Sequence, residues 1–315
     1  MTPNAVYLKA PQYVLGEIEE AHTAIENLSS RARELRIPLK AGLWGWGRIR
    51  RTEKTLEEMA IASGSRTLRS AGIAPSSIDL LILCSTRFPS EVDLHGRMME
   101  TVMTGMGLAD AAFMGITLNR CTNLLSAVHV ADAFVRSGRY RNVLVVTTDR
   151  IADESVRMEK FALFSDGAAS CVVAAEHSDE AYEVLACATA QTPSELDGAN
   201  EISADLSRLV NDRLLGPLGL TLEDVSGLMH ANLFKPLVAM KERLAGFTPA
   251  QIYTENIERI GHCFAADPLI NLVDRAAAGH VRGGGHYMLA SSVAGSRLGV
   301  LLRKVTENGK DGRLS

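Results

Sequence analysis

The fold of this chain is decided by the stretch Met114-Gly-Ile-Thr-Leu-Asn-Arg-Cys121-Thr-Asn-Leu-Leu-Ser-Ala-Val-His129 and by the twenty residues after it, up to Asp149. A short apolar run comes before Cys121, and a second apolar run, Asn142–Asp149, comes after the turn at Ser137-Gly138. Between the two runs, apolar residues recur at the spacing of one helix face: Leu124, Leu125, Val128, Val130, Ala131 and Phe134. The order strand, turn, helix, strand is the crossover unit of a parallel α/β sheet.

The position of Cys121 in this stretch indicates a nucleophile. A cysteine at the start of a helix lies beside unpaired backbone N–H groups and the positive end of the helix dipole, and both favour a thiolate. A strand-to-helix turn also presents a side chain at the sheet edge, where a substrate can reach it. Cysteine is equally one of the most buried residue types, so this stretch alone leaves a core role for Cys121 open.

The composition excludes several classes of function. The chain has 315 residues, of which 46% are hydrophobic and 22% charged, and its formal net charge is -4. Such a chain has no basic field for nucleic acid, and its N-terminus does not have the pattern of a signal peptide. No apolar run is long enough to predict a membrane span. Five cysteines without a CxxC pair are typical of a reducing compartment, so we expect a cytoplasmic protein without a metal site: Cys84, Cys121, Cys171, Cys187 and Cys263.

Periodicity gives a coarse order of elements before Cys121. We expect a strand at 5–15, a charged helix at 16–36, a helix at 53–71, a buried strand at Leu80–Cys84 and a helix at 94–106. The segment Gly42–Arg51 is rich in glycine, but its spacing is not that of a nucleotide-binding loop. This segment ends in a basic edge formed by Arg48, Arg50 and Arg51.

The second half of the chain repeats the first in the same order, about 145 residues later. The matching segments are Ala71–Cys84 with Leu218–His230, the Cys121 unit with Gly261–Ala290, and Phe164–Val173 with Val293–Leu302. Three ordered matches predict an internal duplication, with an N-terminal half at 1–176 that carries the nucleophile and a C-terminal half at 177–315 that carries histidines. We expect the halves to pack as one pseudo-symmetric, layered α/β sandwich.

This duplication brings two histidines near Cys121. Ligands of α/β sheets bind at the carboxyl ends of strands, and equivalent ends of the two halves meet at the pseudo-dyad. His262 opens the helix that matches the Cys121 helix, and His230 ends the strand that matches Leu80–Cys84. A lone histidine is usually a surface or core residue, but two at such positions are candidates for catalysis.

The chain resembles the β-ketoacyl-acyl-carrier-protein synthase III branch of the thiolase-fold condensing enzymes. The resemblance covers roughly residues 40–175 and 215–304. Besides the Cys121 unit, it rests on Gly47-Arg-Ile-Arg-Arg51, Ala71-Gly-Ile73, Phe88-Pro-Ser90, Phe164-Ser-Asp-Gly-Ala-Ala169, His230-Ala-Asn232, Ile260-Gly-His-Cys263 and Ala294-Gly-Ser-Arg-Leu-Gly-Val-Leu-Leu302. It implies a thiolase-like fold, a layered α-β-α-β-α sandwich built from the two duplicated halves.

The resemblance also implies roles for individual residues. Cys121 would take an acyl group from a thioester, His230 would assist, and the backbone N–H groups of Cys121 and Gly295 would form the oxyanion hole. The donor would be acyl-CoA or an acyl carrier protein, with no permanently bound cofactor. Residues that would dock the donor are Arg48, Arg50, Arg51, Lys235 and Asn232, and residues that would line the acyl pocket are Phe88 and Asn123. A solvated basic edge is the alternative for the arginines.

A homodimer is expected as well. In this fold the strand Asn142–Thr147 usually lies at a sheet edge, and its apolar side chains would need a cover. The Phe88 region of a second copy would then cap the acyl pocket.

Several departures from the family leave the reaction open. His262 stands where the family has asparagine, Cys121-Thr-Asn123 replaces Cys-x-Gly, and Ser291–Gly295 replaces a glycine-rich loop. His230-Ala-Asn232 is one residue shorter than the family motif, and the segment between Gln191 and Leu214 is shorter than the family's tunnel cap.

Cysteine with two histidines is the set of the elongating condensing enzymes. The resemblance therefore implies a specialised enzyme of a fatty-acid or polyketide-type pathway, which transfers the acyl group of Cys121 to a malonyl-type thioester with decarboxylation. One alternative is acyl transfer to an alcohol, amine or carrier protein without condensation. Another is an inactive partner subunit of a related synthase.

Overall fold

The computed structural model describes residues 5–89 and 91–306. Its strands are β1 (Tyr7–Leu15), β2 (Ile18–Ala21), β3 (Arg48–Arg51), β4 (Leu80–Cys84), β5 (Ala112–Ile116), β6 (Asn142–Asp149), β7 (Gly167–Ala174), β8 (Tyr182–Gln191), β9 (Val225–Met229), β10 (His286–Val293) and β11 (Ser296–Lys304). Its α-helices are α1 (Leu28–Glu34), α2 (Ala41–Trp44), α3 (Leu56–Ala71), α4 (Val92–Met106), α5 (Asn123–Arg136), α6 (Ala204–Leu215), α7 (Lys235–Leu244), α8 (Glu255–Arg259) and α9 (Asp267–Ala277). Short 3-10 turns include η3 (Arg120–Thr122), η5 (Pro193–Glu195) and η8 (Phe264–Ala266).

The main series of strands is symmetric about its middle. Its order is β5-β4-β6-β7-β1-β8-β11-β10-β9, so that β4, β6, β7 and β1 mirror β9, β10, β11 and β8. The halves join where β1 meets β8, with Tyr7 opposite Glu183 and Leu8 opposite Tyr182. The mirrored order is what an internal duplication produces. Residue 176 lies between β7 and β8, and a division into halves at that residue stays a prediction.

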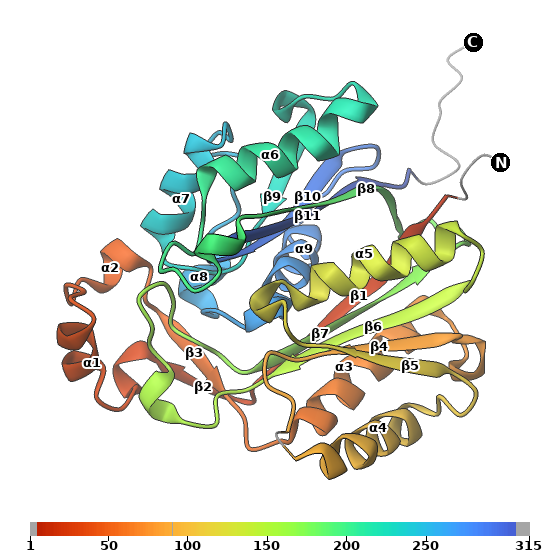
Figure 1. The fold of residues 1–315 in the computed structure, drawn as a ribbon, viewed down its shortest axis with the longest axis horizontal. Helices are drawn as coiled ribbons and strands as arrows, with labels where there is room; N and C mark the ends of the chain where they lie inside the picture. Colours follow the sequence, from red (N-terminus) through yellow and green to blue (C-terminus); the bar gives the residue numbers. More distant parts are fainter. Residues whose placement is uncertain (1–4, 90, 307–315) are drawn as a thin grey trace.

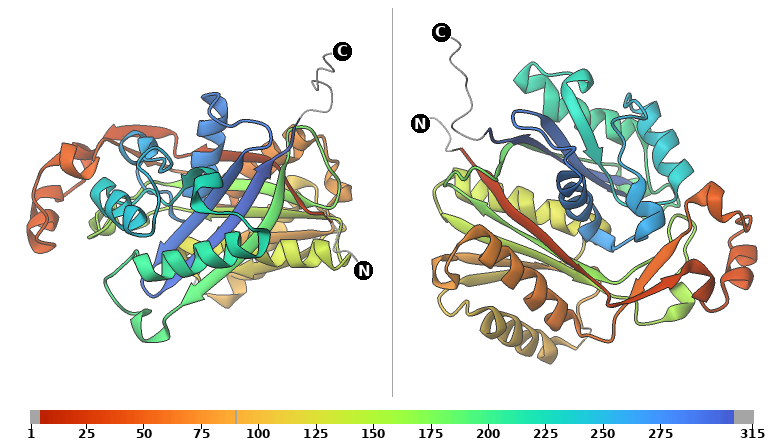
Figure 2. Two further views of the ribbon diagram at one scale, coloured as in Figure 1. Left: turned by 90° about the horizontal axis from the view of Figure 1, so that it is seen from above. Right: turned by 180° about the vertical axis from the view of Figure 1, so that it is seen from behind.

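The helices and strands are stacked in five layers, as Figures 1 and 2 show. Helices α5 and α9 form the middle layer, and each contacts strands of both halves. Helices α3 and α4 cover the outer face of the first half, while α6 and α7 cover that of the second. The largest core cluster lies around the middle layer and includes Leu124, Val145, Leu269 and Val300. The predicted α-β-α-β-α architecture is confirmed.

Local sequence explains where the best-predicted helix begins and ends. Helix α3 starts with a capping box, in which Thr55 accepts from the backbone of Glu58 and Glu58 accepts from the backbone of Thr55. It ends at Gly72, whose φ of 62° is the left-handed conformation that glycine adopts without strain.

The buried face of α5 differs slightly from the expected one. Val135 is buried, whereas Val130 and Phe134 of the expected inner face are half-buried.

The helix expected at 16–36 is wrong. The segment forms β2, a 3-10 turn and the short helix α1, and Asn27 before α1 has a φ of 58°. Strand β2 pairs antiparallel with β3, which places Glu19 opposite Arg50 and pairs both acids of β2 with arginines. Opposite charges on neighbouring strands stabilise the strand pair. Because β3 lies far from β2 along the chain, the composition of residues 16–36 alone does not reveal this pairing.

The edge position expected for Asn142–Thr147 is also wrong. Strand β6 lies between β4 and β7, and the edge of the first half is β5. A strand buried on both faces reads as a continuous apolar run, which is the pattern of β6. The apolar character that suggested a dimer contact therefore has another cause.

The starts of α5 and α9 are equivalent in detail. Arg120 and Phe264, at the first position of η3 and η8, both have a φ of 53°. Asn123 accepts from the backbone N–H of Asn119, as Asp267 does from that of Cys263. By this alignment the counterpart of Cys121 is Ala265. The expectation that His262 opens the matching helix is corrected accordingly, since His262 lies before η8.

Candidate active site

Cys121 lies in the turn η3, at the carboxyl end of the first-half strands. Its side chain is half-buried and packs against an apolar cluster formed by Ile151, Phe164 and Phe264. The hydroxyl of Ser291 donates to the carbonyl of Cys121 at 2.8 Å. The second half of the duplication thus contacts the backbone of the expected nucleophile directly.

His262 is fully buried and forms a pair with Asp267. Its Nδ1 lies 2.5 Å from Oδ2 of Asp267, and both side chains have no exposed surface. The same carboxylate accepts from the backbone N–H groups of Cys263 and Asn232, which fixes its orientation. Nε2 of His262 is buried without a hydrogen-bond partner among residues 5–89 and 91–306.

Electrostatics connects this pair to Cys121. Burial alone would lower the pKa of His262, but the carboxylate of Asp267 and the adjacent sulfur of Cys121 outweigh it and raise that pKa to about 10. The side chains of Cys121, His262 and Asp267 thus follow one another in the order that a nucleophile, an imidazole and an orienting carboxylate would take. Sequence reasoning missed Asp267, although an acidic residue at the start of a helix, five positions after a histidine, was a usable signal.

His230 follows β9 but has other partners than Cys121. Its Nδ1 contacts the carbonyl of Ala231 at 3.0 Å, and its Nε2 lies 3.4 Å from the hydroxyl of Ser292 and 3.5 Å from Glu242. Arg297, also buried, donates to Glu242 and to Ser292. Burial lowers the pKa of His230 to about 4, so the imidazole is neutral at physiological pH.

The face on which Ser292 lies is set by the strand. Successive side chains of a strand point to opposite faces, and the preceding Ser291 is the residue that reaches Cys121. Ser292 and the Nε2 contact of His230 therefore lie toward the other face of β10, where α7 supplies Glu242. The structure brings His262 to Cys121 and ties His230 to a separate buried network.

The turn that contains Gly295 is held in place by contacts from several segments. Gly295 has a φ of 66°, and a side chain there would collide with Glu195 and Leu196. Arg120 donates to the carbonyl of Ala294 at 3.0 Å, and the backbone N–H of Ala294 donates to Glu201. This turn adjoins the site, and the oxyanion roles of Cys121 and Gly295 stay predictions.

The residues expected to dock the donor have different surroundings. Arg50 pairs with Glu19, and Arg51 pairs with Glu20 and Glu154, so neither is a free cation. Arg48 and Lys235 are exposed. Asn232 is buried, where its amide donates to the carbonyl of Gly261 and its oxygen accepts from Asn271. Arg48 and Asn232 line a pocket of about 10 Å³ with Trp46 and Phe234, room for about one water molecule.

The two residues assigned to the acyl pocket make contacts within the first half, and their role in a pocket, for Phe88 that of a second copy, stays a prediction. Asn123 is fully buried, and its amide donates to the carbonyl of Ser85. Phe88 packs against the outer cluster of the first half, beneath α4, and its ring meets that of His95. The apolar side chains that pack beside Cys121 within this chain belong to the cluster around Phe164 and Phe264.

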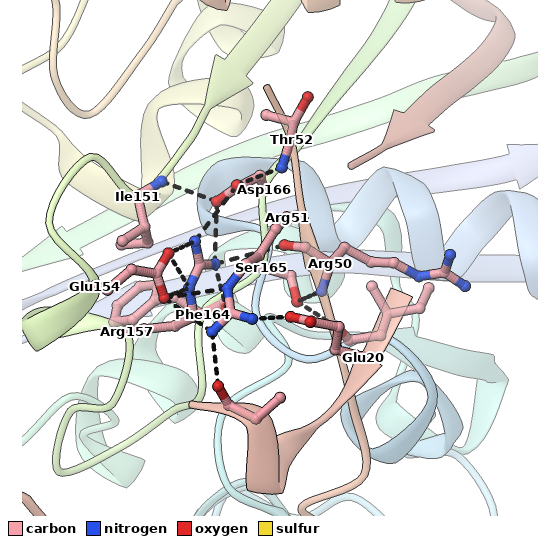
Figure 3. Close-up of polar contacts among 12 residues, drawn as sticks. Glu20, Arg50, Arg51, Thr52, Ile151, Glu154, Arg157, Phe164, Ser165 and Asp166 are labelled. Carbon is pink, nitrogen blue, oxygen red and sulfur yellow. Dashed lines mark hydrogen bonds and ion pairs between the residues drawn. The ribbon is translucent and has the colours of Figure 1, made fainter. Parts of the chain in front are cut away.

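A polar hub holds the loop that supplies much of that wall (Figure 3). Asp166 accepts from the backbone N–H groups of Thr52 and Ile151, and from Arg157 at 3.2 Å. Arg157 is 1% exposed, and it also donates to the carbonyl of Phe164. This hub fixes both ends of the connection 150–166.

The hub also reaches His262 through the backbone. The N–H of Ser165 donates to the carbonyl of His262, and the N–H of His262 donates to Leu163, both at 2.9 Å. The hydroxyl of Ser165 donates to Ile260. The segment 163–165 is therefore a short strand partner for the histidine.

Solved structures define the class of this fold. The chain matches 3-oxoacyl-[acyl-carrier-protein] synthase III of Aquifex aeolicus VF5 with a TM-score of 0.79 at 21% identity, over 95% of this chain and 99% of that one. Acetamide-bound OleA of Xanthomonas campestris matches with a TM-score of 0.80 at 17% identity, over 96% and 100%. The acyltransferase ChlB3 matches with a TM-score of 0.82 at 17% identity, over 96% and 98%. The protein has the thiolase fold.

Sequence comparison shows which family the chain resembles. The family model of 3-oxoacyl-[acyl-carrier-protein] synthase III matches residues 117–192. β-Ketoacyl-[acyl-carrier-protein] synthase III of Aquifex aeolicus is 25% identical over 273 residues, which are 79% of this chain and 84% of that protein. The synthase III of Synechococcus elongatus is 35% identical over 130 residues, 40% and 37% of the two chains. The chain is therefore a divergent, synthase III-like protein with the thiolase fold, similar along most of its length to proteins named as synthases III.

Two further observations concern the described part of the chain. No helix there is both long enough and apolar enough to cross a membrane. No cluster of three or more histidine, cysteine, aspartate or glutamate side chains in 5–89 and 91–306 is suited to hold a metal ion.

Proposed function

We propose that this protein is an acyltransferase in which Cys121 takes an acyl group from acyl-CoA or an acyl carrier protein and passes it to a hydroxyl or amine. The observation that carries this proposal is the buried pair of His262 and Asp267 next to Cys121, in which Nε2 of the histidine has no nitrogen or oxygen partner among the described residues. A cysteine, a histidine and an orienting carboxylate are the minimal set for acyl transfer through a covalent intermediate. Decarboxylation of a malonyl unit is not part of the proposed reaction.

The reaction proceeds in two transfers that restore the starting charges. The thiolate of Cys121 attacks the donor carbonyl, the bond to the donor sulfur breaks, and the leaving thiolate takes a proton from Nε2 of His262. Cys121 is then an uncharged thioester, and His262 is a neutral imidazole. Nε2 next accepts the proton of the acceptor as its oxygen or nitrogen attacks the carbonyl, and the Cys121 thiolate leaves.

The pKa of His262 fits this sequence of steps. One cause that raises this pKa is the sulfur of Cys121, and acylation removes the charge of that sulfur. The imidazole therefore becomes a weaker acid as the thiolate forms and a stronger acid once the thiolate is acylated. It is charged when a donor thiolate needs a proton, and it loses that proton when a base is required.

The contacts of His230 favour acyl transfer over decarboxylative condensation, the reaction that the resemblance implied. An enolate oxygen needs hydrogen-bond donors, and two imidazoles would have to offer Nε2–H. Nδ1 of His230 faces the carbonyl of Ala231, so it carries the proton of the neutral ring, and Nε2 lies beside Ser292. The donor that condensation requires from His230 is thus missing in this arrangement.

Mass spectrometry of the intact protein tests the first transfer. Acetyl-CoA, octanoyl-CoA and the corresponding acyl carrier proteins are the donor probes, and peptide mapping locates the adduct. We expect one acyl group on Cys121 and none in Cys121→Ala. An adduct on Cys84 or Cys263, or no adduct from any donor, would instead support the inactive partner subunit.

Release of labelled carbon dioxide tests the second transfer. Acylated protein is mixed with malonyl carrier protein in one arm and with a panel of alcohols and amines in the other. We expect acyl products in the second arm and no carbon dioxide above the Cys121→Ala background in the first. Carbon dioxide release that is lost in His262→Ala, while Cys121 is still acylated, would return the protein to the condensing enzymes.

A further inference from the structure

Three phenylalanine rings surround the reacting groups. Phe161, Phe164 and Phe264, here called the aromatic enclosure, pack with Cys121 in one apolar cluster. The rings of Phe164 and Phe264 lie 4.7 Å apart, and that of Phe161 meets Phe164 edge-on at 5.9 Å. All three rings also surround the imidazole of His262, at centroid distances of 5.1 Å for Phe164, 5.8 Å for Phe264 and 6.4 Å for Phe161.

Phe264 has a left-handed backbone conformation, which is unusual for a residue with a large side chain. Its φ of 53° is a conformation that a bulky residue adopts at a cost and that glycine adopts freely. Arg120 has the same φ at the equivalent place in the first half, so the fold imposes the conformation on both halves. What the fold does not impose is a phenylalanine there. Strained residues of this kind concentrate at functional sites, and this one directs its ring onto His262.

The other two rings are held just as firmly. Phe161 and Phe164 belong to the connection 150–166, which the Asp166 and Arg157 hub anchors (Figure 3). The backbone carbonyl of Phe161 also accepts from the N–H of Phe234 at 2.7 Å. Phe164 and Phe264 are each 7% exposed, so these rings form a wall between the imidazole and solvent.

A wall of this kind matters for a thioester beside a general base. Water would compete with every other acceptor, because His262 can take its proton as readily as that of an alcohol. The water oxygen would attack the acyl carbonyl, the carbon–sulfur bond would break, and a free acid would form while the Cys121 thiolate and the charged imidazole are restored. Excluding water from the site prevents such side reactions.

We propose that the aromatic enclosure excludes water from acylated Cys121. The acyl group then stays on Cys121 until an acceptor with an apolar portion binds against the rings. Phe264 is the residue that this role assigns most specifically. The inference rests on the proposed acyl transfer, since it concerns the lifetime of the same acyl-enzyme. It extends the proposed function to the class of acceptor, an alcohol or amine with an apolar portion that packs against the rings.

The lifetime of the acyl-enzyme without acceptor tests this inference. Protein acylated by octanoyl-CoA is freed of excess donor, and the loss of the adduct is followed by intact mass. Phe264→Gly removes the ring and suits the local φ, whereas Phe264→Leu keeps apolar bulk. We expect the adduct of Phe264→Gly to disappear about tenfold faster than that of the unchanged protein, and that of Phe264→Leu to persist.

A matched variant separates loss of the ring from relief of the backbone. Arg36 is exposed, has a φ of 58° and lies before β3, away from the enclosure. Arg36→Gly therefore relieves a left-handed residue without opening the site, and its acyl-enzyme should persist. Circular dichroism and the acylation rate establish that each variant is folded.

The outcomes distinguish the two proposals. An adduct that forms in Phe264→Gly and decays at the unchanged rate would overturn the enclosure and leave acyl transfer standing. Equally fast decay in Phe264→Leu and Phe264→Gly would overturn it too, because apolar bulk would then be irrelevant. If the unchanged protein forms no adduct on Cys121, acyl transfer fails and the enclosure fails with it.

Discussion

At the scale of single residues, the charge of His262 depends on one neighbour more than on any other side chain. Burial opposes that charge, whereas Asp267 first and Cys121 second favour it, and together they raise the pKa from 6.5 to about 10. A folded-state pKa above the unfolded value stabilises the protein at low pH. This contribution is complete below about pH 6.5 and disappears as the pH rises toward 10.

Replacing Asp267 by asparagine should reveal this dependence. The difference in melting temperature between the unchanged protein and Asp267→Asn should be largest below pH 6.5 and should shrink between pH 6.5 and 10. Asp79→Asn is the matched control, because Asp79 also accepts two backbone N–H bonds, from Arg141 and Asn142, and forms no hydrogen bond or ion pair with a histidine within 5–89 and 91–306. A pH-independent difference for Asp267→Asn would mean that the carboxylate only supports the backbone.

The same variant should also slow the chemistry. Without the carboxylate, burial lowers the pKa of His262, so the imidazole has less charge to give the leaving donor thiolate at pH 7. We expect acylation of Cys121 to slow by about 100-fold or more, as for other orienting carboxylates. Acylation at the unchanged rate would remove Asp267 from the reaction.

At the scale of elements, the connection 150–166 is what turns an apolar cluster into an ordered site. Breaking a buried ion pair on one side leaves an uncompensated charge and costs about 3–5 kcal/mol. Such contacts join Arg157 with Asp166 and Arg297 with Glu242, whose side chains are at most 1% exposed, but Arg157 has a second carboxylate partner in Glu154. Only the first anchors the loop that carries Phe161 and Phe164.

Asp166→Asn should therefore destabilise no more than Glu242→Gln, because Arg157 keeps Glu154 as a partner, and yet it should impair function more. We expect both variants to lose melting temperature, but only Asp166→Asn to shorten the lifetime of the acyl-enzyme and to lower the rate of acyl transfer. Measuring thermal melting and acyl-enzyme decay side by side checks this. Equal loss of function in both variants would show that stability alone is responsible.

Whether an element could be predicted from the sequence depended on how far along the chain its stabilising partners lie. Helix α3 was predicted because its cap and its C-terminal glycine lie within the element itself. The segment 16–36 was not, because its glutamates are stabilised by arginines of β3. The candidate site divides in the same way. Cys121 was found from its own helix, whereas the surroundings of His230 depend on Glu242 and Arg297, which no local pattern connects to it.

At the scale of the whole molecule, the duplication was predictable because both copies keep the same turns and strands in the same order. The edge of the first sheet was not, because an apolar run does not distinguish a central strand from a covered edge. Strand β5 is the true edge, and its counterpart in the second half is reduced to a single parallel bridge between Leu228 and Ile252. The two ends of the strand series are therefore unlike each other.

A homodimer through β5 remains our expectation, with the contact moved from β6. Phe113 on this strand is 57% exposed and Leu118 just beyond it is 91% exposed, and an open strand edge with apolar side chains invites pairing with a second copy. We expect the unchanged protein to sediment at twice its mass of 34.0 kDa. Phe113→Glu combined with Leu118→Glu should sediment as a monomer, since two like charges would face each other across the dyad.

The control for this dimer is another exposed apolar residue far from β5. Leu244 on α7 is 59% exposed, so Leu244→Glu adds the same charge without touching the edge and should leave the dimer intact. Because β5 leads directly into the turn that carries Cys121, separating the copies should also slow acylation. An unchanged protein that is monomeric and fully active at low concentration would refute the dimer, and loss of dimerisation in Leu244→Glu alone would place the interface on the opposite half.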